Sequence, residues 1–336
     1  EKNFKRGEEL NEIGLITDHS IVIEEGIIKD LIPTIDVELS EYDEIIDAEN
    51  KVILPGLVEC HTHTAFSGSR ANEFKERISG ISYEDIARRG GGINTTVNAV
   101  RKSSFEDIVE VMKPRVFNFI SQGITTLEIK SGYGLDFENE IKLLKAINYI
   151  DQLSPVDIVP TFLGAHTIPP EHKTDRNKYI NILINDLIPY VSENELAYFC
   201  DGFCESTAFS ADEIDAIFTK AAECGLNIKL HTEQFNAIGG LDIALKHNAV
   251  SVDHLEVLKI TDIPKITSSG TVAVLLPGVS FFLDYQYAPA LELIKNNGIL
   301  ALSTDFNPGS SHINNIHFIM WLAAIKMKMT VEEIIS

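Results

Sequence analysis

Residues 52–63 read V-I-L-P-G-L-V-E-C-H-T-H, an apolar run that ends in two histidines separated by one threonine. The apolar residues predict a buried strand, in which alternate side chains point to the same face. His61 and His63 are therefore expected side by side at the end of this strand, about 6–7 Å apart at ~3.3 Å per residue. Two imidazoles at that spacing can bind one metal ion, and imidazole suits zinc and iron. A pair of surface histidines on a loop is the alternative.

Downstream of this stretch, apolar strand-like segments alternate with helix-like segments, a pattern typical of a parallel sheet. Helix starts are recognisable at residues 104–107 (SFED) and in the capping box at residues 210–213 (SADE). Eight strands joined by helical crossovers predict a (β/α)8 barrel. The strand candidates are residues 57–61, 124–130, 157–166, 199–205, 227–233, 249–254, 271–276 and 299–305.

Short strands are predicted before the barrel. Residues 19–32 are expected to form a hairpin with its turn at residues 25–26, and residues 45–53 a second one with its turn at residues 49–50. The insertion between the first two barrel strands is long, roughly sixty residues, and contains the run RRGGG at residues 88–92. Because this run lacks the Gly-Lys-Ser/Thr ending of a phosphate loop, it predicts a flexible turn.

The composition limits the class of protein. The 336 residues, 44% of them hydrophobic, are enough for one large domain or two. No run reaches the ~18 apolar residues of a membrane span, and the first residues lead into no signal-peptide core. The net charge of −22 argues against nucleic acid and is interpreted as serving solubility or a salty habitat. Four cysteines, including Cys200 and Cys204, predict inert thiols in a cytoplasmic protein.

Polar side chains follow the predicted strands at their carboxyl ends, where barrel enzymes place their chemistry. A single histidine is usually structural, but several at successive strand ends predict one shared site. The five other histidines fall on hairpins, helices or loops and are interpreted as structural. In strand order, the strand-end residues are His61 with His63, then Lys130, His166, Glu205, His231 and His254, and finally Asp305 on the eighth strand.

These residues predict a metal-dependent hydrolase. A catalytic metal needs about three protein ligands and an open position for water. His61, His63 and His231 are the predicted imidazole ligands, and Asp305 is a weaker ligand that also holds the water. A bound divalent ion lowers the pKa of water from ~16 towards ~7 and so supplies hydroxide, while Asp305 carries the proton to a leaving nitrogen. His254 is expected to polarise the attacked carbonyl, so the chemistry is hydrolysis at an sp² carbon.

This arrangement resembles the amidohydrolase superfamily, which has His-x-His on the first barrel strand, histidines on the fifth and sixth, and aspartate on the eighth. The resemblance implies a distorted barrel at residues 56–336 and a small β-sandwich domain, built from both chain ends, that includes residues 1–55. Binuclear members have a carboxylated lysine on the fourth strand, whereas this strand ends in Phe-Cys-Glu at residues 203–205. The difference favours one zinc or iron ion per chain, with Lys130 a surface or packing lysine.

Longer blocks narrow the resemblance to the imidazolonepropionase family over nearly the whole chain. By that resemblance the substrate is 4-imidazolone-5-propanoate and the product is N-formimidoyl-L-glutamate, a step in histidine degradation. A homodimer is a further family-level expectation. The matching blocks are residues 66–74 (FSGSRANEF), 90–93 (GGGI), 128–135 (EIKSGYGL), 275–278 (LLPG) and 303–310 (STDFNPGS).

The same resemblance indicates the substrate contacts. Arg70 offers a planar fork for a carboxylate, although a solvent-facing loop arginine is the alternative. Tyr133 lies in a glycine-flanked turn where its phenol can reach a ligand or simply pack, and His166 is similar to a substrate-contacting histidine of the family. Gln234 stands where many relatives have glutamate; its amide cannot carry a proton but can still hydrogen-bond. The remaining matched positions are Asn307, Gly309 and Ser310.

Two other functions stay open at this point. An aminohydrolase, such as a guanine- or cytosine-type deaminase acting on a cyclic amidine, would use the same metal and base but release ammonia. A cationic Arg70 favours the acidic substrate over a neutral base. A metal-free scaffold is disfavoured because it has no need to hold four costly polar groups at strand ends. Residues 330–336 resemble the start of a helix that continues in relatives into strands of the small domain, so a truncation or a loss of that part is expected.

Overall fold

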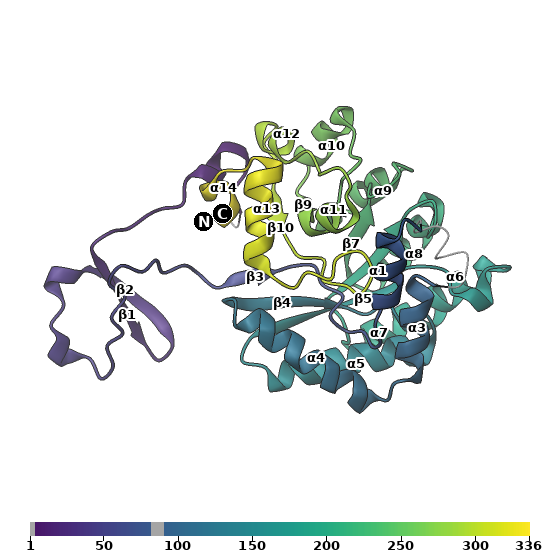
Figure 1. Ribbon diagram of the computed structural model, residues 1–336, viewed down its shortest axis with the longest axis horizontal. Helices are drawn as coiled ribbons and strands as arrows, with labels where there is room; N and C mark the ends of the chain where they lie inside the picture. The colour runs from purple at the N-terminus through teal and green to yellow at the C-terminus, as the bar shows by residue number, and fades with distance from the viewer. Residues whose placement is uncertain (1–3, 82–90) are drawn as a thin grey trace.

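The computed structural model describes residues 4–81 and 91–336, and most of them form a barrel of eight parallel strands surrounded by helices (Figure 1). The strands are arranged in chain order, and each is hydrogen-bonded to the next. All eight predicted strands are present, several of them shorter than expected. They are β3 (Leu57–Glu59), β4 (Ile124–Lys130), β5 (Asp157–Ala165), β6 (Phe199–Cys204), β7 (Asn227–Thr232), β8 (Ser251–His254), β9 (Val272–Leu275) and β10 (Leu300–Leu302).

The barrel closes through an irregular seam between its first and last strands. No regular ladder joins β3 to β10 among the described residues; an isolated bridge pairs Thr62 with Phe306 instead. The Asp305 amide donates to the His61 carbonyl (3.1 Å), and the His63 amide donates to the Phe306 carbonyl (2.9 Å). The seam therefore brings the His-x-His segment directly beside Asp305.

Glu59 reinforces this seam. Its buried carboxyl group accepts hydrogen bonds from the hydroxyl of Ser303, from the Thr304 amide (3.2 Å) and from the His61 amide (3.3 Å). Burial raises the pKa of the Glu59 carboxyl to about 8. A side chain thus supplies the contacts between first and last strand that a regular ladder would otherwise provide.

Helices cover the outside of the barrel (Figure 1). The predicted helix start at Ser104 is confirmed, with a capping box before α4 (Phe105–Ile120). The predicted capping box at Ser210 is present before α8 (Ala211–Glu223). No helix among the described residues is both long and apolar enough to cross a membrane. The other α-helices are α1 (Ala71–Ile78), α3 (Ile93–Lys102), α5 (Phe137–Leu153), α6 (Arg176–Ile182), α7 (Ile188–Glu193), α9 (Gly240–Lys246), α10 (Ile263–Thr267), α11 (Pro277–Leu283), α12 (Ala290–Lys295), α13 (Ile316–Met327) and α14 (Val331–Ile335).

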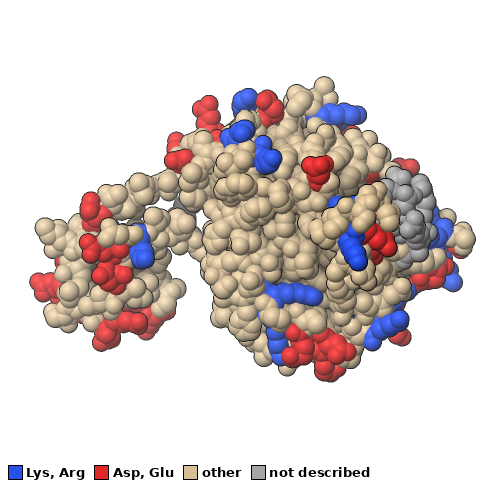
Figure 2. Space-filling model, in the orientation of Figure 1, with Lys and Arg blue, Asp and Glu red and all other residues tan. Residues whose placement is uncertain are grey.

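Residues 12–56, which we call the arm, extend away from the barrel (Figure 1). The first predicted hairpin is confirmed, because β1 (His19–Glu24) pairs antiparallel with β2 (Ile27–Pro33) across a turn at Glu25 and Gly26. Acidic side chains gather on the arm (Figure 2). Many of its apolar side chains are also exposed, Ile35 by 92% and Ile46 by 82%.

Two predictions about this region are wrong. Residues 45–53 form only a turn, closed by the Lys51 amide and the Ala48 carbonyl (2.9 Å), with no strand on either side. Residues 52–58 are not a buried strand, since Val52 is 79% exposed and only the last two residues of the run belong to β3. Within residues 4–81 and 91–336, no strand pairs with residues 52–56, so this apolar stretch forms no sheet.

The two ends of the described chain pack together. The short helix η1 (Gly7–Asn11) contacts α12 and α14, and the Ser336 hydroxyl donates to the Leu10 carbonyl (2.7 Å). The predicted helix start near the C-terminus is confirmed by a capping box between Thr330 and Glu333. Of the predicted glycine-rich turn at residues 88–92, residues 88–90 lie outside the described residues. Gly92 has a left-handed φ of 73° and precedes α3.

Candidate metal centre and active site

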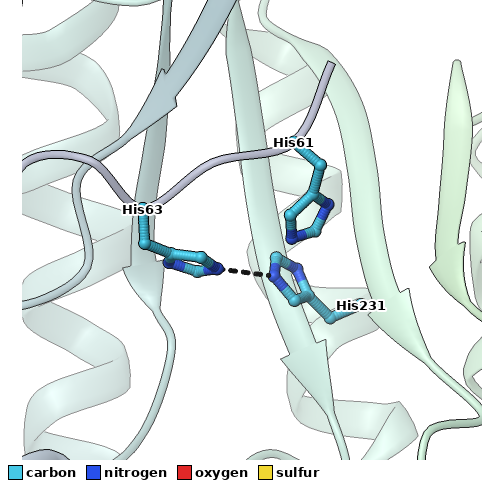
Figure 3. A group of neighbouring side chains, drawn as sticks. All are labelled: His61, His63 and His231. Carbon is cyan, nitrogen blue, oxygen red and sulfur yellow. Dashed lines mark hydrogen bonds between the residues drawn. The ribbon is translucent and has the colours of Figure 1, made fainter. Parts of the chain in front are cut away.

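Three imidazoles converge at the carboxyl end of the barrel. His61 and His63 come from the segment after β3 and His231 from β7, and their rings face one another (Figure 3). Nε2 of His231 lies 3.4 Å from Nε2 of His63. Asp305 Oδ1 lies 3.2 Å from His63 Nε2 and 3.4 Å from His61 Nε2. All four side chains are buried, so the ligands predicted from the sequence are brought together.

The chemistry of this donor set fits a metal ion. His61 Nε2 and Asp305 Oδ1 are buried and have no hydrogen-bond partner among the described residues. Burial lowers the pKa of His63 and His231, so both imidazoles are neutral, with a lone pair available. Neutral imidazole nitrogens and one carboxylate oxygen are ligands that zinc and iron accept.

The strand ends that carry these residues have unusual backbone conformations. His254 has a φ of 90°, Leu255 a φ of 68°, and Asp305 a φ of 48°. Residues other than glycine rarely adopt a positive φ. Those that do are found most often at functional sites. His254 is the last residue of β8, and Asp305 lies three residues beyond the end of β10, so these left-handed conformations occur where the site residues leave their strands.

His254 is placed beside the metal site with an acidic neighbour. Its Nδ1 lies 3.4 Å from Glu256 Oε1, and both side chains are buried. Burial alone would lower the pKa of His254, but the Glu256 carboxylate raises it above its ordinary value. A protonated His254 can donate a hydrogen bond to a developing oxyanion. With His61 and Asp305 it forms a second group of potential metal ligands.

His166 and Tyr133 line the same site. The His166 ring stacks on His63, with centroids 5.1 Å apart, and its Nδ1 lies 2.9 Å from the Gly132 carbonyl oxygen. Burial lowers the pKa of His166 to about 3, which keeps it neutral. The Tyr133 ring lies 5.8 Å from that of His63. The structure thus places both predicted substrate contacts next to the candidate ligands.

A buried carboxylate shapes the loop that carries Tyr133. Glu140 accepts hydrogen bonds from the amides of Gly132 (3.0 Å), Gly134 (2.7 Å) and Leu135 (2.9 Å). Gly134 has no room for a side chain, because a Cβ there would lie 2.4 Å from the Glu140 amide nitrogen. The glycine-flanked turn noted in the sequence is therefore required by the packing of this loop.

Arg70 reaches the loop that follows β10. A Cβ on Gly309 would lie 2.0 Å from Arg70 Nη1, so the guanidinium occupies the space that glycine leaves. Arg70 Nε donates to Glu73 Oε2 (2.7 Å), while Glu73 Oε1 accepts from the Gly92 amide (3.0 Å) and the Thr95 hydroxyl (2.7 Å). Arg70 and the 303–310 block, far apart in the sequence, thus meet beside the site.

Asn307, Gly309 and Ser310 hydrogen-bond to one another within their own loop. The Asn307 side chain accepts hydrogen bonds from the amides of Gly309 and Ser310, both at 2.7 Å, and donates to the Asp305 carbonyl (2.7 Å). Gln234 is buried just after β7. Substrate contact by these residues stays a prediction.

Glu205, at the end of the fourth barrel strand, holds the chain next to Gln234. Its Oε2 accepts hydrogen bonds from the amides of Phe235 and Asn236, both at 3.0 Å. Its other oxygen, Oε1, accepts from the Asn236 side chain (2.8 Å). The strand-end position of Glu205 was noted in the sequence, and the structure gives it a role in shaping this loop.

Sequence reasoning missed the charged residues inside the barrel. Lys130, interpreted as a surface or packing lysine, is fully buried and bonded to Glu128 (2.6 Å) and Asp201 (2.8 Å). These carboxylates raise its pKa despite burial. A sequence signal existed, because a charged residue stands two positions before each of three strand-end residues and so on the same strand face. The pairs are Glu59 with His61, Glu128 with Lys130, and Lys229 with His231.

Comparisons with known proteins place the chain in a family. It is 42% identical over 336 residues to an imidazolonepropionase of Clostridium tetani, covering 99% of this chain and 80% of the relative. It is 43% identical over 330 residues to an imidazolonepropionase of Thermoanaerobacter pseudethanolicus, covering 98% of this chain and 79% of the relative. The chain belongs to the imidazolonepropionase family. No family model matches it.

Solved structures support the fold. The chain resembles a 5-methylcytosine deaminase from Klebsiella pneumoniae, with a TM-score of 0.71, 15% identity, and coverage of 93% of this chain and 78% of the other. It also resembles an adenosine deaminase from Xanthomonas campestris with bound zinc. The TM-score is 0.63 and the identity 14%, and the match covers 95% of this chain and 71% of the other. Membership of the imidazolonepropionase family makes the chain a hydrolase of C–N bonds, and the predicted amidohydrolase barrel is confirmed.

Proposed function

We propose that this protein opens the ring of 4-imidazolone-5-propanoate by metal-dependent hydrolysis and releases N-formimidoyl-L-glutamate. The observation that carries the proposal is the convergence of His61, His63, His231 and Asp305. Two of their ligand atoms, His61 Nε2 and Asp305 Oδ1, are buried without a hydrogen-bond partner among the described residues. Membership of the imidazolonepropionase family supplies the substrate. One zinc or iron ion per chain would be held by these four side chains.

Asp305 and His254 have separate roles in the proposed reaction. A divalent cation held at the site would act as a Lewis acid and would lower the pKa of a water molecule towards neutrality. Asp305, at the seam, takes the proton of the attacking water and delivers it to the leaving ring nitrogen. His254, whose pKa Glu256 raises, donates a hydrogen bond to the carbonyl oxygen as negative charge develops on it. Burial of all these groups strengthens their electrostatic interactions.

The propanoate group is bound on the side of the site where Arg70 meets Gly309. The guanidinium offers paired donors to a carboxylate. Tyr133 and His166 contact the ring from the side of His63, as their ring distances support. The loops around the site add further contacts from Gln234, Asn307, Gly309 and Ser310.

Residues 1–55 belong to a small β-sandwich domain and residues 56–336 to the barrel. The arm's hairpin and its exposed apolar side chains support this division. Light scattering of the purified protein tests the homodimer expected from the family.

The deciding experiment measures loss of ultraviolet absorbance of freshly generated 4-imidazolone-5-propanoate, with metal analysis, a chelator-treated control and an ammonia assay. Metal-dependent loss without ammonia supports ring hydrolysis. Absence of turnover at full metal occupancy contradicts the proposal. Ammonia release from a cyclic amidine, with the imidazolone left intact, would show a deaminase instead.

A further inference from the structure

Below the three imidazoles, the barrel interior holds ionisable side chains that the proposed reaction does not use. They are all at most 5% exposed, and we call them the buried ion layer. Burying charges is costly, and buried ion pairs seldom add net stability relative to apolar packing. Stability therefore does not explain why these side chains are buried, and their contacts must be considered instead. The members of the layer are Glu59, Glu128, Lys130, Asp201, Lys229 and Asp253.

Asp253 contacts the side of His61 that faces away from the other imidazoles. Its Oδ2 lies 2.5 Å from His61 Nδ1, with both side chains fully buried. The Ser251 hydroxyl donates to Asp253 Oδ1 (2.6 Å), and Lys229 Nζ lies 3.5 Å from Oδ2. An ionised carboxylate can only accept a hydrogen bond, so the proton sits on Nδ1 and the lone pair on Nε2.

Asp201 contacts Nδ1 of His231 in the same way as Asp253 contacts Nδ1 of His61. Its Oδ1 lies 3.1 Å from His231 Nδ1, and its Oδ2 accepts from Lys130 Nζ (2.8 Å). One oxygen of Asp201 therefore faces the imidazole and the other is paired with a buried ammonium. His231, like His61, thus presents its Nε2 lone pair to the site.

Lys130 links this arrangement to the His-x-His segment. Its ammonium donates to Glu128 Oε1 (2.6 Å), and Glu128 Oε2 accepts from the Thr62 amide (3.1 Å). Thr62 stands between His61 and His63. One unbroken chain of hydrogen bonds therefore runs from the backbone of the first-strand ligands, through Glu128, Lys130 and Asp201, to the fifth-strand ligand.

We propose that Asp201 and Asp253 are positioning residues that fix the tautomers of His231 and His61 for metal binding, and that Lys130 couples the two halves of the ligand set. This inference rests on the metal site of the proposed function. Carboxylates that orient metal-binding histidines typically change metal affinity about 10–100-fold when they are altered. In Asp201→Asn, the amide can donate to Nδ1 and favour a proton on Nε2, which blocks the ligand lone pair.

The first test measures zinc affinity by competition with a chromophoric chelator, for the parent chain, Asp201→Asn and Asp253→Asn. The matched control is Asp215→Asn, which removes an Asp–His contact (2.7 Å to His247 Nε2) on α8, away from the site. We expect zinc affinity to fall about 10–100-fold in both site variants, with altered visible bands of the cobalt-substituted protein, and to stay unchanged in the control. Unchanged affinity in folded site variants would overturn the inference.

A second measurement does not depend on the variants folding. The zinc-loaded parent chain, labelled with ¹⁵N in its histidines, should show Nδ1–H protons of His61 and His231 that exchange slowly with solvent. Two imidazoles protonated on Nε2 would overturn the inference even if the protein is active. A parent chain that binds no zinc and has no activity would instead contradict the proposed function itself.

Discussion

The barrel interior and the arm invert the usual distribution of residues. Inside the barrel, Lys130, Asp201 and Asp253 are fully buried, while on the arm Ile35 and Ile46 are almost fully exposed. Each buried charge has a partner of opposite charge or a hydrogen-bond donor within the barrel. Ile35 and Ile46 have no such covering among the described residues. Partners, rather than hydropathy alone, decide burial in this molecule.

The largest loss of activity is expected when Asp305, the proposed proton carrier, is replaced. Asp305→Asn should lower kcat by about 10²–10⁴-fold, because an amide cannot accept and return the proton. The measurement is steady-state hydrolysis together with metal analysis, which separates loss of the proton carrier from loss of metal. Asp242→Asn, on the exposed face of α9, is the control. Near-normal turnover of Asp305→Asn would refute the assigned proton transfer.

The second prediction concerns the stability of the buried ion layer. Lys130→Met should lower the free energy of unfolding by about 3–5 kcal/mol, because Glu128 and Asp201 are left as buried carboxylates without their cation. Denaturant unfolding of the chelator-treated protein measures this loss. Lys265→Met, at an exposed ion pair on α10, should leave stability unchanged. Equal stability of the two variants would mean that water molecules or rearranged side chains inside the barrel compensate for the lost ammonium group.

The sequence predicted the barrel well because its signals are local. Apolar strands, helix caps and strand-end histidines each occupy a few consecutive residues, and the parallel topology brings the strand ends together. His61, His63, His231 and Asp305 could therefore be assembled without coordinates.

The failures involve partners that are distant in the sequence. Lys130 looked like a packing lysine because Asp201 is 71 positions away. Residues 52–54 looked buried because nothing in the sequence shows that the arm leaves the barrel. The hydrogen bonds of Asn307 within residues 305–310 also become visible only in the structure, and its contact with substrate stays a prediction.

A third prediction tests the cation at the edge of the barrel. Arg70→Ala should raise KM by about 10–100-fold through loss of charge-assisted hydrogen bonds to the propanoate, while metal content stays unchanged. Arg70→Lys should restore only part of the affinity, because an ammonium lacks the planar fork. Saturation curves for the three proteins provide the measurement. Identical KM values would remove Arg70 from the substrate site.

A smaller effect is expected at the glycine beneath Arg70. In Gly309→Ala the new Cβ would lie 2.0 Å from Nη1, so the guanidinium must shift, which a flexible side chain can do at low cost. We expect a rise in KM of less than about 10-fold, since the cation is displaced rather than removed. Gly270→Ala is the matched control, because a Cβ there meets open space. A KM equal to that of Arg70→Ala would show that the exact position of the guanidinium decides binding.

The smallest change in the free energy of unfolding is expected for a substitution on the arm, in contrast to one in the barrel. Ile46 is already 82% exposed, so Ile46→Ser should change the free energy of unfolding by no more than about 0.5 kcal/mol. Ile147→Ser, in the core on α5, should cost several kcal/mol by the same denaturant measurement. A loss above about 1 kcal/mol for Ile46→Ser would mean that the arm is covered in solution. Dependence of that loss on protein concentration would identify a second copy of the chain as the cover, because association stabilises by mass action.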